Sequence, residues 1–340
     1  MTLQKKFLLG TVYGFIHFSV EVTSFYFLFS RITASPVCWV LALFFDAIAF
    51  LSQGILGNLI DRYLKCNIGL IGCLLMMAAL WIGADVPALV LLALGNAMIH
   101  IAGAQHTLRG TKGKIAPNAV FVGGGSFGVI TGQLLGGAAS AKLLVIPLFL
   151  MAVSTVAVCV IHKRDPLSDT AATLAISADR GASFLVLCTL VAVIVRGYTA
   201  YAIPTEWNKA PPQAVALFVC MGIGKILGGV LGDRIGFRRV SMISLLGGLP
   251  FLLAGNTNIT VSLLGVALFS MTMPVTVAIL VSAFPKRVGF AFGITTIGLF
   301  LGSAPAFFVR PQTLFAHQIT VIALTLAALP AVFACTKKGR

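Results

Sequence analysis

The chain has 340 residues, of which 59% are hydrophobic and only 10% are charged, and its mean hydropathy is +1.02. A soluble domain carries about 25% charged residues, so these charges could not cover a water-facing surface. The composition excludes an ordinary soluble protein and predicts a chain solvated by lipid. Since a membrane-spanning helix takes about 20 residues, the length has room for roughly a dozen spans and no large extramembrane domain.

Twelve apolar segments can be distinguished along the chain. They cover residues 7–30, 36–57, 67–83, 86–105, 118–138, 143–162, 183–203, 213–232, 239–254, 259–282, 287–308 and 315–335. A polar, charged stretch separates the first six from the last six. We therefore predict an all-α integral membrane fold with about 12 transmembrane helices in two pseudo-symmetric six-helix bundles, residues 1–162 and 183–340, joined by a cytoplasmic linker, 163–182. Eleven spans are the alternative, because some segments are short.

The positive charges predict the orientation. With the N-terminus inside, 18 of the 24 Lys and Arg residues fall in the inner segments, and the outer segments hold Arg31, Lys142, Lys209 and Arg310. This asymmetry predicts cytoplasmic termini in a multi-pass protein of the cell inner membrane. It also accounts for the net charge of +15 without a nucleic-acid partner, since basic inner segments contact anionic membrane lipids.

The first span carries ionisable groups on one face. Gly10, Gly14, His17, Glu21 and Ser24 recur at three- and four-residue steps, which align on a helix. Ionisable residues inside a membrane are candidate functional sites. Glu21 is a candidate for substrate binding and for proton coupling, and His17 for proton coupling. The alternative for such a histidine is a plain hydrogen-bond donor.

Polar residues continue in the second, fourth and fifth spans. Asp46 lies near the middle of the second span and has no matching cation at its own depth, so it could exchange a proton near neutral pH. Asn96 and His100 lie four residues apart in the fourth span, and Gln133 lies in the fifth. We expect Asn96 and Gln133 to contact substrate and His100 to take part in proton coupling.

The seventh and eighth spans contribute two cations. Arg196 is about as deep in the seventh span as Glu21 is in the first, and a tyrosine follows each five residues later, Tyr201 and Tyr26. Glu21 and Arg196 could form a functional pair or gate. The alternative is a structural ion pair, whose loss of one partner would cost about 3–5 kcal/mol.

Lys225 occupies the place in the eighth span that Gln53 occupies in the second, eight residues before an aspartate in both cases. Arg196 and Lys225 together favour an anionic substrate, since guanidinium suits carboxylate, phosphate or phosphonate. Tyr26 and Tyr201 are further candidates for the substrate site. Glu21 and Asp46 could equally serve a cationic or lipophilic amine, and this alternative stays open.

A short motif appears twice. GNLIDR (residues 57–62) follows the second span, and GVLGDR (residues 229–234) follows the eighth. The pair resembles the loop motif of the Major Facilitator Superfamily, although Leu64 replaces the turn glycine in the first copy. The resemblance implies a secondary transporter in which Asp61, Arg62, Asp233 and Arg234 latch the two halves together. The alternative is charge that only sets topology.

The fifth span also carries Gly124, Gly128, Gly132 and Gly136. Glycines at this spacing let a second helix backbone approach closely, so the stripe predicts helix packing.

Nothing in the sequence predicts an enzyme or a cofactor. No Walker loop or G-x-S-x-G elbow is found, and the seven cysteines form no C-x-x-C pair or His-linked cluster, so no metal site is expected. We interpret the chain as a monomeric, alternating-access secondary transporter of a small organic solute, preferably a proton-coupled organic-anion carrier. The alternatives are an exporter of cationic or amphipathic drugs or lipids, and a non-transporting membrane scaffold or sensor.

Overall fold

The computed structural model describes residues 3–63, 65–138, 140–167, 169–174, 176, 181–202, 205–308 and 314–335. Within these ranges the regular secondary structure is helical. The one β-type contact is an isolated bridge between Gly113 and Leu174. Ten helical stretches in the described chain are long and apolar enough to cross a membrane. Two shorter apolar helices, Ile68–Ala79 and Gln318–Pro330, accompany them.

The first half contains six helical segments. They are α1 (Leu3–Phe27, continued by the π-helical turn Leu28–Ile32), α2 (Cys38–Ile60), α3 (Ile68–Ala79), α4 (Asp85–Leu108), α5 (Ala116–Gly137) and α6 (Val145–Arg164, preceded by a 3-10 turn, Ala141–Leu144). Helix α1 packs against α4, α5 and α6, while α4 also contacts α2 and α3. Local polar residues mark some ends: the Asn67 side chain accepts a hydrogen bond from the Leu70 amide and caps α3, as expected for asparagine before a helix.

The second half also contains six segments, several of them divided. They are α7 (Ala182–Ala202), α8 (Pro211–Ile235), α9 (Phe237–Met242) with a π-helical turn (Ile243–Gly247) and α10 (Gly248–Ala254), α11 (Ile259–Ser270) with α12 (Thr272–Ala283), α13 (Val288–Ser303) with a 3-10 turn (Ala304–Phe307), and α14 (Leu314–Cys335). The predicted all-α membrane fold is confirmed, and the short segments predicted at 67–83 and 239–254 correspond to α3 and to α9–α10.

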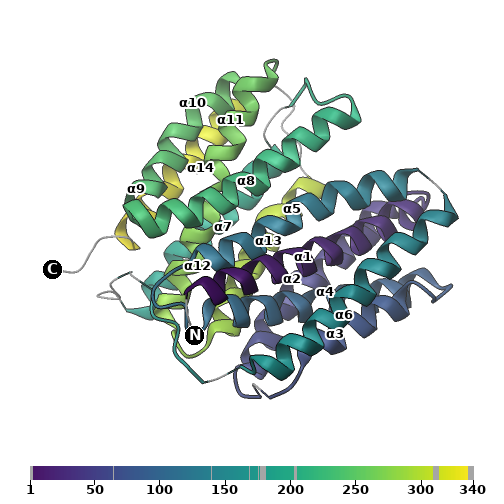
Figure 1. The fold of residues 1–340 in the computed structure, drawn as a ribbon. Coiled ribbons are helices and arrows are strands. Elements are labelled where there is room, and N and C mark those ends of the chain that lie inside the picture. Colours follow the sequence, from purple (N-terminus) through teal and green to yellow (C-terminus); the bar gives the residue numbers. More distant parts are fainter. Residues whose placement is uncertain are drawn as a thin grey trace.

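The two groups of helices form neighbouring bundles, coloured purple to teal and green to yellow in Figure 1. They meet through two pairs of helices, α2 with α13 and α5 with α8. In each pair, the second segment of one half packs on the fifth segment of the other. We call the end of the molecule that holds the α2–α3 turn, the α8–α9 turn and residues 169–174 the linker face, and the opposite end the far face.

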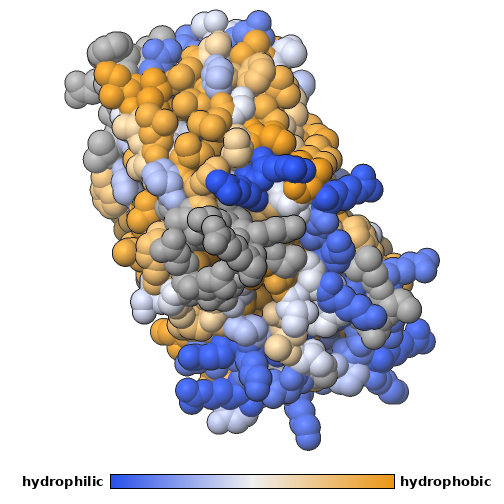
Figure 2. Space-filling model, turned by 90° about the vertical axis from the view of Figure 1, so that its left-hand side faces the viewer, coloured by the Kyte–Doolittle hydropathy of each residue, from blue (hydrophilic) through white to orange (hydrophobic). Residues whose placement is uncertain are grey.

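Apolar side chains project outward from the bundles. Ile55, Trp81 and Phe149 have exposed fractions of 76%, 72% and 65%. Figure 2, which views the molecule from the left-hand side of Figure 1, shows broad apolar areas in its upper part and hydrophilic residues along the lower part and right-hand edge. Apolar surface of this extent is unusual on a soluble monomer and is what a lipid environment requires.

The glycines of α5 set the distance between α5 and α1. A Cβ atom added at Gly124 would lie 2.1 Å from the Gly14 carbonyl oxygen, and one at Gly128 would lie 2.3 Å from the Phe18 carbonyl oxygen. A Cβ atom added at Gly132 or at Gly136 would lie 2.6 Å from the carbonyl oxygen of Val22 or of Tyr26, respectively. Because these contacts are to backbone, which cannot rotate away, the stripe is a packing surface as predicted.

Gly128→Ala should therefore destabilise the fold, by about 1–3 kcal/mol for an overpacked contact. Gly137→Ala is the matched control, because a Cβ atom added at Gly137 meets nothing within 4 Å. Thermal unfolding in detergent should show a clear loss for Gly128→Ala and little change for Gly137→Ala. Equal melting temperatures for the two variants would contradict the packing role.

Candidate functional site

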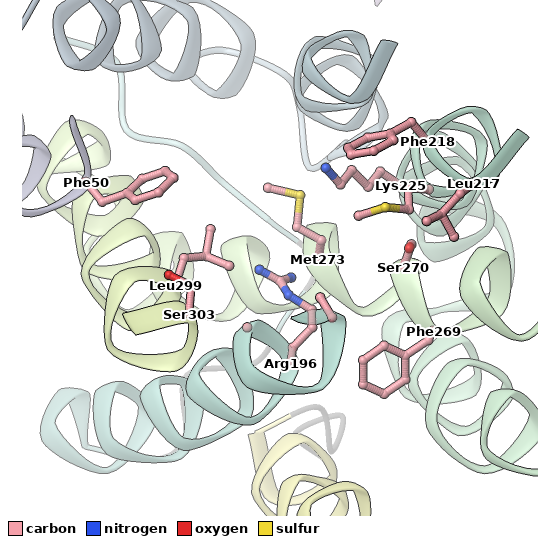
Figure 3. Close-up of a pocket in the computed structure, with 13 residues that line it drawn as sticks. Phe50, Arg196, Leu217, Phe218, Lys225, Phe269, Ser270, Met273, Leu299 and Ser303 are labelled. Carbon is pink, nitrogen blue, oxygen red and sulfur yellow. The ribbon is translucent and has the colours of Figure 1, made fainter. Parts of the chain in front are cut away.

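A cavity of about 340 Å³ lies between the halves, walled mainly by the second half. Its walls come from α2, α7, α8, α11, α12 and α13, and most lining side chains are apolar. Arg196, Lys225, Ser270 and Ser303 supply the polar groups (Figure 3). The lining residues of α7, α8 and α13 lie in the parts of these helices from mid-length to the far face. The cavity therefore occupies the far-face side of the bundle interior.

Two cationic side chains point into this cavity. The Arg196 guanidinium and the Lys225 ammonium approach its middle near Met273 (Figure 3). Arg196 is buried, and its one hydrogen bond within the described residues is a long one, 3.4 Å from Nη1 to Thr276 Oγ1. Lys225 is half-buried and donates to Ser126 Oγ across the interface between the halves, at 2.8 Å. Neither cation forms an ion pair with a carboxylate of the described chain.

The cavity wall also contains a break in a helix. α11 ends at Ser270 and α12 begins at Thr272, two residues before Pro274. Proline has no amide hydrogen and so cannot donate to the carbonyl four residues earlier, which here is that of Ser270. The Ser270 carbonyl therefore lacks its usual helical donor, and Ser270 lines the same cavity as the two cations. Such interrupted helices are typical of solute sites in transporters.

A second polar group lies inside the first half. Glu21 Oε1 accepts a hydrogen bond from Asn96 Nδ2 at 3.1 Å, and Asn96 Nδ2 is also 3.2 Å from Ser24 Oγ. The Nε2 atoms of His17 and His100 are 3.5 Å and 3.6 Å from the same carboxylate oxygen. The side chains around the Glu21 carboxylate, which are those of His17, Ser24, Asn96 and His100, belong to α1 and α4. The polar residues predicted to share one face of the first span therefore lie together against α4.

Helix α5 connects this cluster with the cavity. A Cβ atom added at Gly125 would lie 2.3 Å from His17 Nε2, so the imidazole packs directly on that glycine. The next residue, Ser126, accepts the hydrogen bond from Lys225. The Glu21 cluster and the Lys225 ammonium thus lie at one level of α5, on neighbouring residues.

Asp46 lies on α2, one helical turn before the cavity-lining Phe50. Residues four apart share a helix face, so Asp46 lies on the face of α2 that carries Phe50, one turn closer to the far face, although it does not itself line the cavity. The residue is half-buried. No hydrogen bond or ion pair joins its carboxylate to another residue in the described chain.

At the linker face, each half caps a helix of the other half. Asp61 accepts hydrogen bonds from the amides of Gly289 and Phe290, in the first turn of α13, at 3.0 Å and 2.8 Å. Asp233 accepts from the amides of Ile115 and Ala116, at the start of α5, at 2.9 Å each. A helix N-terminus offers free N–H groups and a positive dipole end. The carboxylates therefore hold the halves together at this face.

Arginine participates in this seal at a position that the sequence did not predict. Arg109 Nη2 donates to Asp61 Oδ1 at 2.9 Å and to the Lys286 carbonyl at 3.0 Å, and its Nη1 reaches the Thr170 carbonyl at 3.2 Å. The motif arginines Arg62 and Arg234 are instead exposed. The resemblance implied that these arginines take part in the latch; in the described chain the arginine that pairs with Asp61 is Arg109.

The remaining predicted site residues are dispersed. The Glu21–Arg196 ion pair does not form, because Glu21 is held by Asn96 and the two histidines. Tyr26 is buried against the α5 glycine stripe and Gln133 is half-buried in α5; neither lines the cavity. The side chain of Tyr201 lies outside the described part of the structure.

Several cavity residues carried no sequence signal. Phe50, Met221 and Leu299 are ordinary apolar residues of apolar spans. Ser126, the partner of Lys225, is a small residue inside the glycine-rich segment. The break at Pro274 was the available signal for Ser270.

Solved structures with this architecture belong to the Major Facilitator Superfamily. The chain is similar to FucP, a transporter of that superfamily in the outward conformation, with a TM-score of 0.71 and 13% identity over 97% of this chain and 98% of the other. A variant of the Escherichia coli fucose:proton symporter FucP matches with a TM-score of 0.67 and 13% identity, over 97% and 99% of the two chains. No protein-family model and no curated protein matches the sequence. The chain has the Major Facilitator fold.

The cross-half caps lead to a prediction for Asp233→Asn. The amide keeps the shape but loses the charge and one acceptor, which should weaken the contact by about 1.5–3 kcal/mol and favour separation at the linker face. Spin-label distances between α5 and α8 at that face should broaden toward longer values. Arg234→Gln, at the exposed neighbour, is the control and should match the wild type. Unchanged distances in Asp233→Asn would remove the latch role.

Proposed function

We propose that the chain is a secondary transporter that carries a small organic anion by alternating access, coupled to protons. The observation that carries this proposal is the pair of cations in one cavity, Arg196 and Lys225, without a carboxylate partner in the described chain. The two bundles, residues 1–162 and 183–340, would rock about the cavity, joined by the linker 163–182. One copy of the chain contains both halves, so a monomer suffices.

The cost of burying charge supports an anionic substrate. A charge taken out of water is costly unless it is paired, and the hydrogen bonds that Arg196 and Lys225 make to the described residues go only to hydroxyl groups. An anion placed between the two would supply the missing charge, and the guanidinium offers it two parallel N–H donors. A cationic substrate would instead add to the repulsion, so the alternative of an amine exporter is disfavoured.

The size and walls of the cavity support a compact organic solute. Its volume of about 340 Å³ lies at the lower end of the range for small-molecule sites. Phe50, Phe218 and Leu299 offer apolar contacts for the body of the solute. A scaffold that had lost transport would be expected to show a filled cavity and mutually neutralised charges, which is not the arrangement of Arg196 and Lys225.

The contacts at the linker face support alternating access. The Asp61 and Asp233 caps close that end, whereas the cavity occupies the far-face side. This is the arrangement expected of an outward-facing state, and the similar FucP structure is described as outward. Opening at the linker face would require both caps to break.

We assign the proton acceptor to Asp46. The residue lies one helical turn from the cavity-lining Phe50, is half-buried and has no hydrogen-bond or ion-pair partner in the described chain. An apolar membrane interior favours the uncharged carboxylic acid, so opening and closing of the cavity to water would change proton binding. The similar FucP is a fucose:proton symporter, which supports proton coupling in a fold of this kind.

We place the linker face in the cytoplasm and the protein in the cell inner membrane. The basis is the excess of Lys and Arg in the segments assigned to that face. Reporter fusions at both ends of the chain should score as cytoplasmic. A non-cytoplasmic score at either end would overturn this orientation.

Lys225→Gln should weaken binding of the anion. Glutamine is the residue at the matching place in the first half, so the packing should survive while one charged hydrogen bond is lost, which costs about 1.5–3 kcal/mol. Lys209→Gln, at an exposed lysine outside the cavity, is the control. A ligand found by a thermal-shift screen of carboxylates, phosphates and phosphonates should bind Lys209→Gln normally. Equally tight binding to Lys225→Gln would eliminate the proposed site.

Asp46→Asn should separate binding from coupling. The amide cannot release a proton, so the variant should bind the anion as the wild type does but no longer concentrate it in liposomes when a proton gradient is imposed. Exchange of labelled for unlabelled anion, which needs no gradient, should continue. Gradient-driven accumulation by Asp46→Asn would reassign the proton to another residue and leave the anion site intact.

A further inference from the structure

Three metal-ligand side chains converge inside the first half, away from the anion cavity. His17, Glu21 and His100 each offer one ligand atom, and these three atoms lie within 4.8 Å of one another. His17 and Glu21 are one turn apart on α1, and His100 projects from α4. The imidazole rings stand at 77° to each other with centroids 4.3 Å apart.

The hydrogen bond made by Nδ1 of each histidine determines whether the Nε2 atom, which faces the Glu21 carboxylate, carries a hydrogen or a lone pair. His17 Nδ1 is 2.9 Å from the Phe121 carbonyl oxygen, and His100 Nδ1 is 2.9 Å from the Asn96 carbonyl oxygen. A carbonyl can only accept, so Nδ1 must carry the hydrogen in both rings. In the neutral imidazoles, both Nε2 atoms then present lone pairs toward Glu21 Oε1. Three electron-pair donors face one point.

The spacing favours a metal ion over a shared proton. Hydrogen bonds to nitrogen span about 2.7–3.2 Å, but Nε2 of His17 and of His100 are 3.5 Å and 3.6 Å from Glu21 Oε1. Zinc bonds of about 2.0–2.2 Å at tetrahedral angles hold neighbouring ligand atoms about 3.3–3.6 Å apart. Both of these separations fall in that interval, and the ligand atoms of the two histidines lie within 4.8 Å of each other.

We propose that His17, Glu21 and His100 form a binding site for a transition-metal dication of the Zn²⁺ class. Two imidazoles and one carboxylate are a ligand set that zinc accepts, with the fourth position left for water or a small anion. The Phe121 and Asn96 carbonyls accept hydrogen bonds from the far side of the rings and so orient the imidazoles, and Asn96 Nδ2 orients the carboxylate in the same way. Mg²⁺ and Ca²⁺ prefer all-oxygen sites.

The cluster is enclosed but not sealed. The side chains retain exposed fractions of 8% (His17), 9% (His100) and 11% (Glu21). None of the three residues lines the cavity of Arg196 and Lys225, so the site goes beyond the proposed anion transport, and a failure of zinc binding would leave that proposal standing.

The test is titration of Zn²⁺ and Co²⁺ into the purified full chain. The affinity tag used for purification should contain no histidine. Isothermal titration should show one Zn²⁺ site, Zn²⁺ should raise the melting temperature, and Co²⁺ should give the intense visible absorption of a four-coordinate complex. His17→Gln and His100→Gln should each weaken Zn²⁺ binding by more than about 100-fold. Asn96→Ala removes only a group that orients a ligand, so it should weaken binding by about 10- to 100-fold.

Matched variants keep the outcome decisive. His162→Gln removes a half-buried histidine at the end of α6 and should bind Zn²⁺ as the wild type does. His100→Cys keeps a zinc ligand, so it should retain binding and add a thiolate-to-cobalt band even if His100→Gln folds poorly. Absence of a Zn²⁺ site in the wild type, or Zn²⁺ binding unaffected by His17→Gln and His100→Gln, would overturn the proposal.

Discussion

The arrangement of the two halves depends on a pair of crossed helix caps. Asp61 belongs to the first half but satisfies the free amides of α13 in the second, and Asp233 does the reverse for α5. Buried helix N-termini need acceptors, and charged acceptors are the strongest available. Because each cap crosses the interface, the halves cannot part at the linker face without exposing two helix ends and two carboxylates.

The position of the cavity follows from this constraint. With the linker face closed, space between the halves is left on the far-face side, where Arg196 and Lys225 project into it. The ammonium of Lys225 also bonds to the first half, through Ser126. Since His17 packs on the adjacent Gly125, a change at Lys225 reaches the Glu21 cluster through two neighbouring residues of one helix. The cavity and the polar cluster of the first half are thus physically connected through α5.

Much of the fold could be predicted from the sequence, because lipid leaves few alternatives. Apolar stretches of about 20 residues must form helices when no water is present to satisfy the backbone, and the repeated aspartate motif marked equivalent turns of the two halves. The glycine spacing in the fifth span predicted a close contact with another helix, because it depends only on residues near each other in sequence. The structure shows that this helix is α1. The pairing of α2 with α13 and α5 with α8 depends on contacts between distant segments, which a single sequence does not contain.

The site was only partly predictable, for a related reason. The ionisable residues Glu21, Arg196 and Lys225 are conspicuous in apolar spans, but their partners are set by the rotation of each helix. Glu21 was expected to face Arg196, yet the turn of α1 directs it to His100 and Asn96 of α4. Arg109 was indistinguishable in sequence from other basic residues of its loop, and only the folded chain shows it 2% exposed beneath Asp61.

The central claim is that the cavity is open to one side of the membrane at a time, under control of the crossed caps. Ser270→Cys places a thiol of similar size in the cavity wall, in a chain whose seven native cysteines are replaced. A membrane-impermeant thiol reagent should label it from the far face and not from the linker face, and adding Asp61→Asn with Asp233→Asn should open access from the linker face. Labelling from the linker face with both aspartates intact, or no gain of access when both are removed, would contradict the account.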